Sequence, residues 1–215
     1  MWWSRNRLGI VGAGELGLCL ARLASEHGYQ VMVASTGVPS RLEKEFRHDA
    51  LKVRAGTVQD VAHFARMIVL ALPMGRFRDI RRDQFDDKIM IDAMNAPQQD
   101  AGEYVNYPGG TSVMVQDWFT DAHVVKTFNH FSSQEMRALA RRKGHKDRRA
   151  IAAVSDDPWA LDRVLKLINK LGFDPVSAGR LSAGTLLQPG GPAHGAAHDK
   201  KQLADLVNQA WTTAA

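Results

Sequence analysis

Short runs of apolar residues alternate along the chain with longer segments in which apolar residues recur every three or four positions. The short runs are typical of buried β-strands, and the longer segments are typical of amphipathic helices. The predicted strands are 8–11, 31–34, 68–72, 89–91, 124–127, 150–154 and 175–177. The predicted helices between them are 15–27, 58–66, 114–120, 133–143 and 158–171. This alternation predicts an α/β fold that is doubly wound around a mainly parallel sheet.

The composition changes after residue 184, where the segment GTLLQPGGPAHGAAHDKK is rich in Gly, Pro and His. Such a segment is typical of a loop, and the pattern over 201–211 predicts a last helix after it. A chain of 215 residues suffices for one good-sized domain. We therefore expect a main domain over residues 1–180 and a C-terminal arm with a helix over 181–215.

Charge and cysteine content narrow the class of protein only slightly. The formal net charge of +5 suits anionic ligands without naming one. Cys19 is the single cysteine and lies in an apolar run, which favours a buried thiol and a cytoplasmic location. No apolar window is long enough to span a membrane. The basic run RRKGHKDRR contains no aromatic residue to stack on bases, so a solvated loop is preferred over a nucleic-acid site.

The segment RLGIVGAGELGLCLARLA carries the strongest chemical signal. Its glycines, Gly12, Gly14 and Gly17, follow a predicted strand and open a predicted helix. In this motif the first glycine allows a tight turn, the second lets the backbone approach a diphosphate, and the third lets helix and strand pack closely. The free N–H groups at the helix start then hold the diphosphate. The spacing and its context predict a Rossmann-type dinucleotide-binding fold.

The residues that end the second predicted strand favour one of the two nicotinamide cofactors. An acid at this position bonds both ribose hydroxyls and repels a 2′-phosphate. This chain instead has Ser35 and Thr36, with Arg41 close by. Hydroxyls and an arginine donate to phosphate oxygens, so the pattern predicts NADP as the cofactor. Alternatively, the hydroxyl residues shape a turn and cap the next helix.

Several motifs together resemble a known family, the NADP-dependent oxidoreductases related to the deazaflavin (coenzyme F420)-dependent NADP reductases. They occur in the family's order over most of the chain and are GIVGAGELG, VLALPMG, IDAMNAP, VVKTFNHF, AVSDD and LGFDPVSAGRLSAGTLLQPGGP. The archaeal reductases of that family have an arginine where this chain has Thr36, so Arg41 is expected to take over its phosphate contact.

The resemblance implies a role for three groups of residues. Residues along the diphosphate would be Ala13, Gly14, Glu15 and Leu16. The 2′-phosphate would be bound by Ser35 and Thr36. The nicotinamide end would be bordered by Leu72, Pro73, Met94 and Asn95.

Polar residues also end the predicted strand 124–127, on the side of the sheet where doubly wound folds bind ligands. Asn129 and His130 are candidate substrate contacts there. Alternatively, Lys126 is exposed, Asn129 stabilises the following turn and His130 hydrogen-bonds a carbonyl. A metal site at His194 and His198 is not expected, because neither a helix nor a third ligand accompanies them.

The leading hypothesis is an oxidoreductase that passes hydride between NADP(H) and a second acceptor, either a deazaflavin, a flavin or a metal complex. Such a transfer needs orientation rather than a general acid, so no catalytic residue is assigned. Two alternatives stay open: a non-catalytic NADPH-sensing regulatory protein, and a reductase of small carbonyls or imines that would use His130 as proton donor. About forty residues remain beyond the sheet. These cannot form a large helical second domain, so we expect a homodimer or the C-terminal arm to close the acceptor side.

Overall fold

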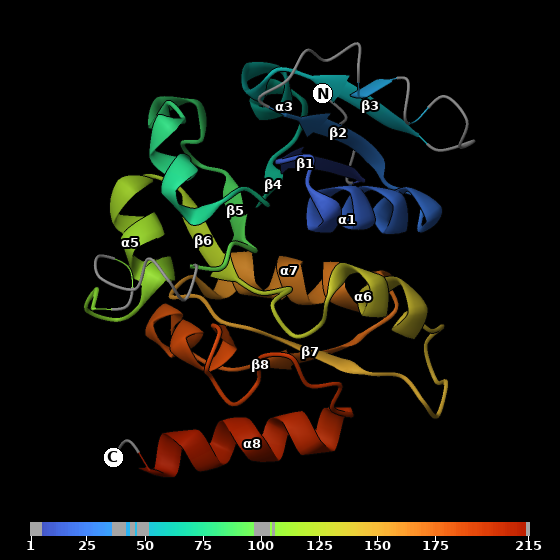
Figure 1. Cartoon of the computed structure of the whole chain (residues 1–215), viewed down its shortest axis with the longest axis vertical. Coiled ribbons are helices and arrows are strands. Elements are labelled where there is room, and N and C mark those ends of the chain that lie inside the picture. Colours follow the sequence, from blue (N-terminus) through green and yellow to red (C-terminus); the bar gives the residue numbers. More distant parts are fainter. Residues whose placement is uncertain are drawn as a thin grey trace.

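The computed structural model describes residues 6–35, 42–43, 46, 52–96, 104 and 106–213. Its main feature is a six-stranded parallel sheet with the order β3-β2-β1-β4-β5-β6. The strands are β1 (Arg7–Val11), β2 (Gln30–Ala34), β3 (Val53–Gly56), β4 (Met67–Leu70), β5 (Ile89–Asp92) and β6 (His123–Lys126). The order reverses direction between β1 and β4, which confirms the predicted doubly wound fold (Figure 1).

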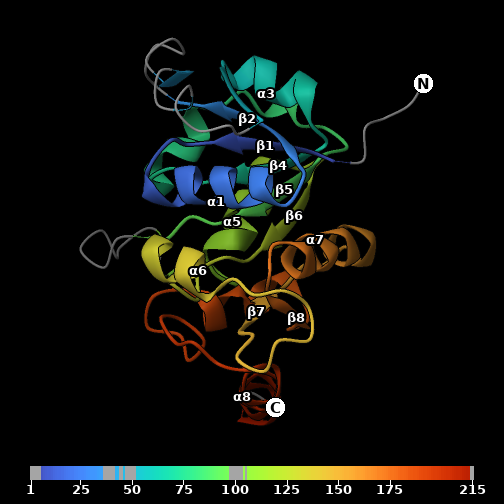
Figure 2. The ribbon, with the colours of Figure 1, turned by 90° about the vertical axis from the view of Figure 1, so that its right-hand side faces the viewer.

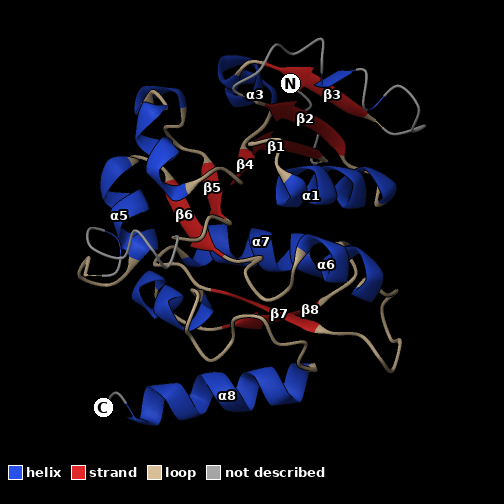
Figure 3. Ribbon diagram, in the orientation of Figure 1, coloured by secondary structure: helices blue, strands red, loops and turns tan. Residues whose placement is uncertain are grey.

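Helices cover both faces of this sheet (Figures 1 and 3). The helices are α1 (Glu15–Glu26), α3 (Val58–Phe64), α5 (Thr111–Trp118), α6 (Ser133–Leu139), α7 (Pro158–Lys170) and α8 (Lys200–Thr213). One hydrophobic core contains residues of α3 and α5, and a second core contains residues of α1, α6 and α7. The two cores take alternate residues of the central strands, because successive side chains of a strand point to opposite faces.

Short 3-10 helices, which the pattern did not predict, connect some of these elements. They are η1 (Met74–Asp79), η2 (Arg82–Gln84) and η4 (Leu181–Leu187). The start of α7 shows common capping chemistry: Asp157 accepts from the backbone N–H groups of Trp159 and Ala160, and Pro158 occupies the first turn. None of the helices in the described part of the chain is long and apolar enough to cross a membrane.

Two predicted strands lie outside the large sheet. β7 (Ala150–Ala153) and β8 (Asp174–Ser177) pair in parallel as a separate small sheet. A single antiparallel bridge between Lys126 and Val154 joins this small sheet to the end of β6. The last helix, α8, packs on β7 and β8 through Leu203 and Val207, at the end of the molecule opposite α3 (Figures 1 and 2).

The sequence analysis missed β3, and the reason is its position. It is an edge strand of four residues that pairs only with β2, and its burial pattern is mostly open. The run VRAG contains Arg54 and a glycine, so neither a buried apolar run nor a long alternation marks it.

Candidate functional site

The turn between β1 and α1 explains why its first glycine is needed. Gly12 has a φ of +120°, a conformation that residues with a Cβ rarely adopt. Its N–H donates to Ala34 O at 2.8 Å, and a Cβ on Gly12 would lie 2.1 Å from Ala71 O. The turn is therefore wedged between the ends of β2 and β4, and only glycine fits there.

The other two glycines of the motif are in different situations. A Cβ on Gly17 would lie 2.0 Å from Gly12 O, so Gly17 lets α1 pack on the turn. A Cβ on Gly14, in contrast, would meet nothing within 4 Å, and its φ of −76° is ordinary. The packing of the protein itself does not require a glycine at position 14. This open position fits a ligand that approaches the backbone closely.

The start of α1 completes an anion-binding geometry at the same place. Gly14 is its N-cap, and no side chain caps this first turn. The first N–H groups of a helix have no intrahelical partners, and the helix dipole favours negative charge beside them. These features fit the diphosphate of a dinucleotide.

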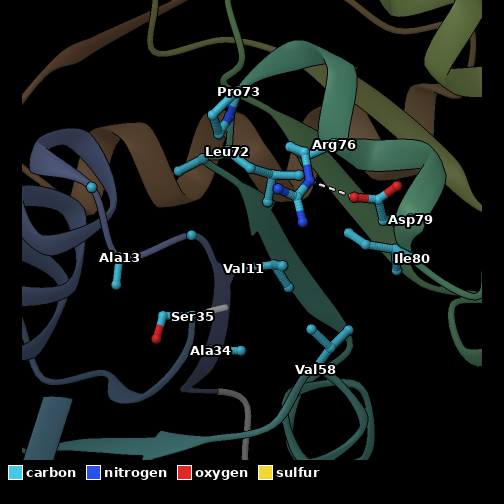
Figure 4. Close-up of a pocket in the computed structure, with 13 residues that line it drawn as sticks. Val11, Ala13, Ala34, Ser35, Val58, Leu72, Pro73, Arg76, Asp79 and Ile80 are labelled. Atoms are coloured by element: carbon cyan, nitrogen blue, oxygen red, sulfur yellow. Dashed lines mark hydrogen bonds and ion pairs between the residues drawn. The ribbon is translucent and has the colours of Figure 1, made fainter. Parts of the chain in front are cut away.

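A cavity of about 630 Å³ opens in front of this turn (Figure 4). It lies at the carboxyl ends of β1, β2 and β4, next to the point where the strand order reverses. Open parallel sheets bind their ligands at that point. The cavity is lined by Val11, Gly12, Ala13, Gly14, Ala34, Ser35, Val58, Ala71, Leu72, Pro73, Arg76, Asp79 and Ile80.

Six of the predicted cofactor residues line this cavity: Gly12, Ala13, Gly14, Ser35, Leu72 and Pro73. They come from three separate turns that the fold brings together. Thr36 and Arg41, the other predicted phosphate contacts, lie outside the described residues.

Glu15 and Leu16 do not contribute side chains to the cavity. The Glu15 carboxylate accepts a hydrogen bond from Ser133 Oγ at 3.4 Å and borders a separate depression of about 350 Å³ beside Cys19. Leu16 packs against the core that contains α1. Neither residue is among those that line the cavity.

The sequence analysis missed the wall formed by Val58, Arg76, Asp79 and Ile80. Arg76 Nε donates to Asp79 Oδ2, and the pair points into the cavity opposite Ser35 (Figure 4). Arg76 and Asp79 lie on η1, Ile80 follows its last residue, and Val58 is the first residue of α3. None of the four belongs to a motif recognised in the sequence. The one available signal was the arginine that follows the PMG turn after β4.

Met94 and Asn95 follow β5 and do not line the cavity; they are held by a buried polar cluster. Asp92 Oδ1 accepts from Met94 N at 3.0 Å, and Lys126 Nζ donates to Met94 O. Asp92 and Lys126 are both 0% exposed and form an ion pair of 3.5 Å. Burial lowers the pKa of Lys126, and the charge of Asp92 opposes this shift. The interpretation of Lys126 as an exposed residue is therefore wrong.

Asn129 and His130, the predicted substrate contacts, are buried as well. Asn129 Nδ2 donates to Asn95 Oδ1 at 2.6 Å and so braces the turn after β5. His130 Nε2 accepts from Ala152 N at 3.0 Å, so His130 does not hydrogen-bond a carbonyl through this atom as the alternative interpretation required. Burial, with smaller contributions from His194, His198 and Lys126, lowers the pKa of His130 to about 3. His130 is therefore a neutral side chain that connects the two sheets. It is not a proton donor in the cavity.

The C-terminal arm lies away from the cavity. Ala150 N donates to His198 O, and Ala193 is buried, so the arm folds back on β7. No residue of the described part of 181–215 lines the cavity. Within the described residues, no group of three or more His, Cys, Asp or Glu side chains could hold a metal ion.

Sheet order and glycine turn together define the class: this is a Rossmann-type α/β protein, with a cavity where its strand order reverses. Residues 7–96 match the family of coenzyme F420-dependent NADP oxidoreductases, which confirms the resemblance noted in the sequence. The match supports an NADP oxidoreductase, and it covers the glycine turn, the end of β2 and the turns after β4 and β5. Among curated proteins, none matches the sequence significantly.

Solved structures resemble the whole described fold. A hypothetical protein of Sinorhizobium meliloti has 26% sequence identity and a TM-score of 0.80, with 91% of this chain and 96% of that chain covered. A candidate F420-dependent NADP reductase of Arthrobacter sp. FB24 has 19% identity and a TM-score of 0.67, with coverage of 96% and 91%. An imine reductase of a Pseudomonas species has 14% identity and a TM-score of 0.59, but only 57% of its chain is covered. At such identities the last two similarities show the fold alone.

Proposed function

We propose that this protein is an NADP(H)-dependent oxidoreductase that transfers hydride between the nicotinamide and a second acceptor: a deazaflavin, a flavin or a metal complex. One observation carries the proposal: Gly14 faces the open cavity, where the packing of the protein gives no reason for a glycine. A diphosphate on the first turn of α1 supplies that reason.

The placement of the two nucleotide halves follows from the sheet order. With the diphosphate at the end of β1, the adenosine half extends toward β2 and Ser35. Because Ser35 stands where NAD-binding proteins carry an acid, the site favours a ribose with a 2′-phosphate. The nicotinamide half then extends over the ends of β4, β5 and β6, past Leu72 and Pro73.

The cavity lining supports direct hydride transfer. When bound, the nicotinamide supplies the hydride; the protein has to bind, orient and exclude water. The described lining contains no His, Cys or Lys, and its one acid, Asp79, is paired with Arg76. Carbonyl reduction would need a proton donor beside the nicotinamide. Hydride transfer between two ring systems does not, and the reduction of two ferric chelates by one NADPH releases a proton instead of consuming one.

The test is binding and turnover with the whole chain. Calorimetry should give tighter binding of NADPH than of NADH, and NADPH absorbance should fall when a deazaflavin, a flavin or a ferric chelate is added. Equal affinities for the two cofactors would contradict the argument from Ser35. Tight NADPH binding without turnover of any acceptor would favour the non-catalytic NADPH-sensing protein instead.

A further inference from the structure

The buried ion pair at the ends of β5 and β6 has a specific geometry. Asp92 accepts the N–H of Met94, and Lys126 donates to the carbonyl of the same residue. Both polar groups of Met94 are thereby held by two fully buried charged side chains. Asn129 adds a second bond to the same carbonyl, at 3.3 Å, and fixes the side chain of the exposed Asn95.

General stability does not explain this arrangement well. Moving two charges out of water is costly, and well-packed apolar residues of similar size are often at least as stabilising. What the pair does provide is a fixed position for the two peptide groups that flank Met94, because Asp92 holds the first through its N–H and Lys126 holds the second through its carbonyl. The cluster is further clamped by Ser112 Oγ, which donates to Asp92 Oδ2 at 2.7 Å.

The backbone around Met94, which this cluster holds, lies where the nicotinamide half of a dinucleotide would lie. β5 is the neighbour of β4, whose following turn lines the cavity with Leu72 and Pro73. A dinucleotide with its diphosphate at the end of β1 and its adenosine toward β2 extends its other half over β4 and β5. The exposed side chain that the cluster fixes next to Met94 is the amide of Asn95. An amide both donates and accepts, as does the carboxamide of nicotinamide.

We propose that the Asp92–Lys126 pair is a positioning device for the nicotinamide half of the cofactor: it fixes the backbone on both sides of Met94 so that Asn95 meets the carboxamide. Asp92 and Lys126 are thus positioning residues, while Asn95 touches the cofactor. The inference rests on the proposed NADP(H) function and assigns this part of the site to named residues.

The fold also links this device to the C-terminal segment. Gly184 of η4 packs on Lys126, since a Cβ there would lie 3.4 Å from Lys126 Cγ. Gln188, which follows η4, donates to Thr111 Oγ1 at the start of α5, next to Ser112. The end of the chain therefore buttresses the pair, although it does not line the cavity.

The test uses the whole chain with two ligands, NADPH and 2′,5′-ADP, and compares Lys126→Met and Asn95→Ala with the wild type. 2′,5′-ADP lacks the nicotinamide half, so both variants should bind it within about twofold of the wild type. NADPH binding should weaken by about tenfold, the loss of one hydrogen bond to a well-held group. The increase in fluorescence anisotropy of bound NADPH, which reports an immobilised nicotinamide, should be lost.

Arg148→Met is the matched control. Arg148 is also a buried cation that donates to backbone carbonyls, those of Asn169 and Phe173, and it pairs with Asp174 at 3.4 Å. It lies in the β7–β8 region, so its removal should lower the melting temperature without changing the anisotropy.

Unchanged NADPH affinity and anisotropy in Lys126→Met would overturn the inference, as would an equal loss in Arg148→Met. If Lys126→Met does not fold, the exposed Asn95→Ala decides: wild-type anisotropy in that variant would also overturn it. A wild-type protein that binds neither ligand would instead contradict the proposed function itself, whereas binding of 2′,5′-ADP with a mobile nicotinamide would contradict only this inference.

Discussion

Gly14 separates a requirement of the ligand from a requirement of the fold. Gly12 and Gly17 are both glycine because a Cβ would collide with backbone about 2 Å away, and Gly14 is free of such contacts. Substitutions of Gly12 and Gly17 should therefore lower the stability of the protein, whereas a substitution of Gly14 should weaken ligand binding.

Substitution of Gly14 tests this distinction. Gly14→Ala should leave the melting temperature unchanged, because the new methyl group meets no protein atom within 4 Å. It should weaken NADPH binding at least tenfold, since the methyl group keeps the diphosphate from the backbone. Gly17→Ala is the control and should lose stability. If Gly14→Ala binds NADPH like the wild type, the diphosphate does not lie on this turn.

Arg76 has a role that the motif does not suggest. Its guanidinium is held through Nε by Asp79 and shares a wall with the apolar side chains Val58 and Ile80. A planar guanidinium in an apolar slot suits stacking on a base. Since adenine is common to both cofactors, Arg76→Ala should weaken NADPH and NADH alike, by about fivefold for a contact of roughly 1 kcal/mol.

The control for Arg76 is Arg81→Ala. Like Arg76, Arg81 forms an ion pair with a nearby acid, Asp83, but Arg81 does not line the cavity. Calorimetry on the two variants should show an effect only for Arg76. A loss confined to NADPH would instead make Arg76 a phosphate ligand.

Arg41 carries the complementary prediction. If it contacts the 2′-phosphate, Arg41→Ala should weaken NADPH about tenfold and leave NADH nearly unchanged, because the lost bond is one that only NADP can make. If Arg41→Ala does not change the ratio of the NADPH and NADH affinities, Arg41 does not contact the 2′-phosphate. The hydroxyl residues after β2 would then bind it alone.

The junction of β6 with β7 depends on a buried neutral histidine. His130 accepts from Ala152 N, and Thr127 Oγ1 donates to Ala152 O at 2.8 Å. With a pKa of about 3 in the folded protein and 6.5 when unfolded, His130 is protonated only in the unfolded chain at mildly acidic pH. The free energy of unfolding therefore falls as the pH drops below 6.5, down to about 3.

His130→Gln tests this link, because glutamine can accept the same N–H and does not titrate. Between pH 7 and pH 5 the wild type should lose about 2 kcal/mol more stability than the variant in urea unfolding. His194 and His198, which contribute to the shift of the His130 pKa, are present in both proteins, so the comparison isolates His130. Parallel pH profiles of the two proteins would mean that His130 is not held neutral by the fold.

Elements with a strong local signal could be predicted from the sequence, and those that depend on tertiary contacts could not. The glycine turn is marked by its glycine spacing, and α7 is marked by its N-cap and its periodicity, so both could be placed from the sequence. β3 is recognisable only through its pairing with β2. Lys126 looked exposed because lysine usually is, and only the neighbouring strand supplies the Asp92 carboxylate that permits its burial.

For the same reason, half of the cavity was predictable and half was not. Gly12, Gly14 and Ser35 belong to a motif whose spacing carries the chemistry. Arg76 and Ile80 reach the cavity only because η1 leads the chain back across the end of β4, and no local pattern marked that turn.

At the scale of the whole molecule, we propose that a second copy of the chain closes the acceptor side. The C-terminal arm and α8 pack on β7 and β8, and the described part of this segment does not line the cavity. A second copy of the chain could then cover the nicotinamide half, as in closed twofold assemblies. We expect light scattering to give the mass of a homodimer at all concentrations that support turnover. A monomer with full activity would rule out this arrangement.

A crystal structure of the protein with NADP⁺ tests the central claim most directly. The diphosphate should lie on Gly12–Gly14 at the start of α1, the adenine between Val58 and Arg76, the 2′-phosphate at Ser35, and the nicotinamide beyond Pro73 toward Asn95. Electron density for the cofactor outside the cavity, or a diphosphate away from the glycine turn, would contradict the account.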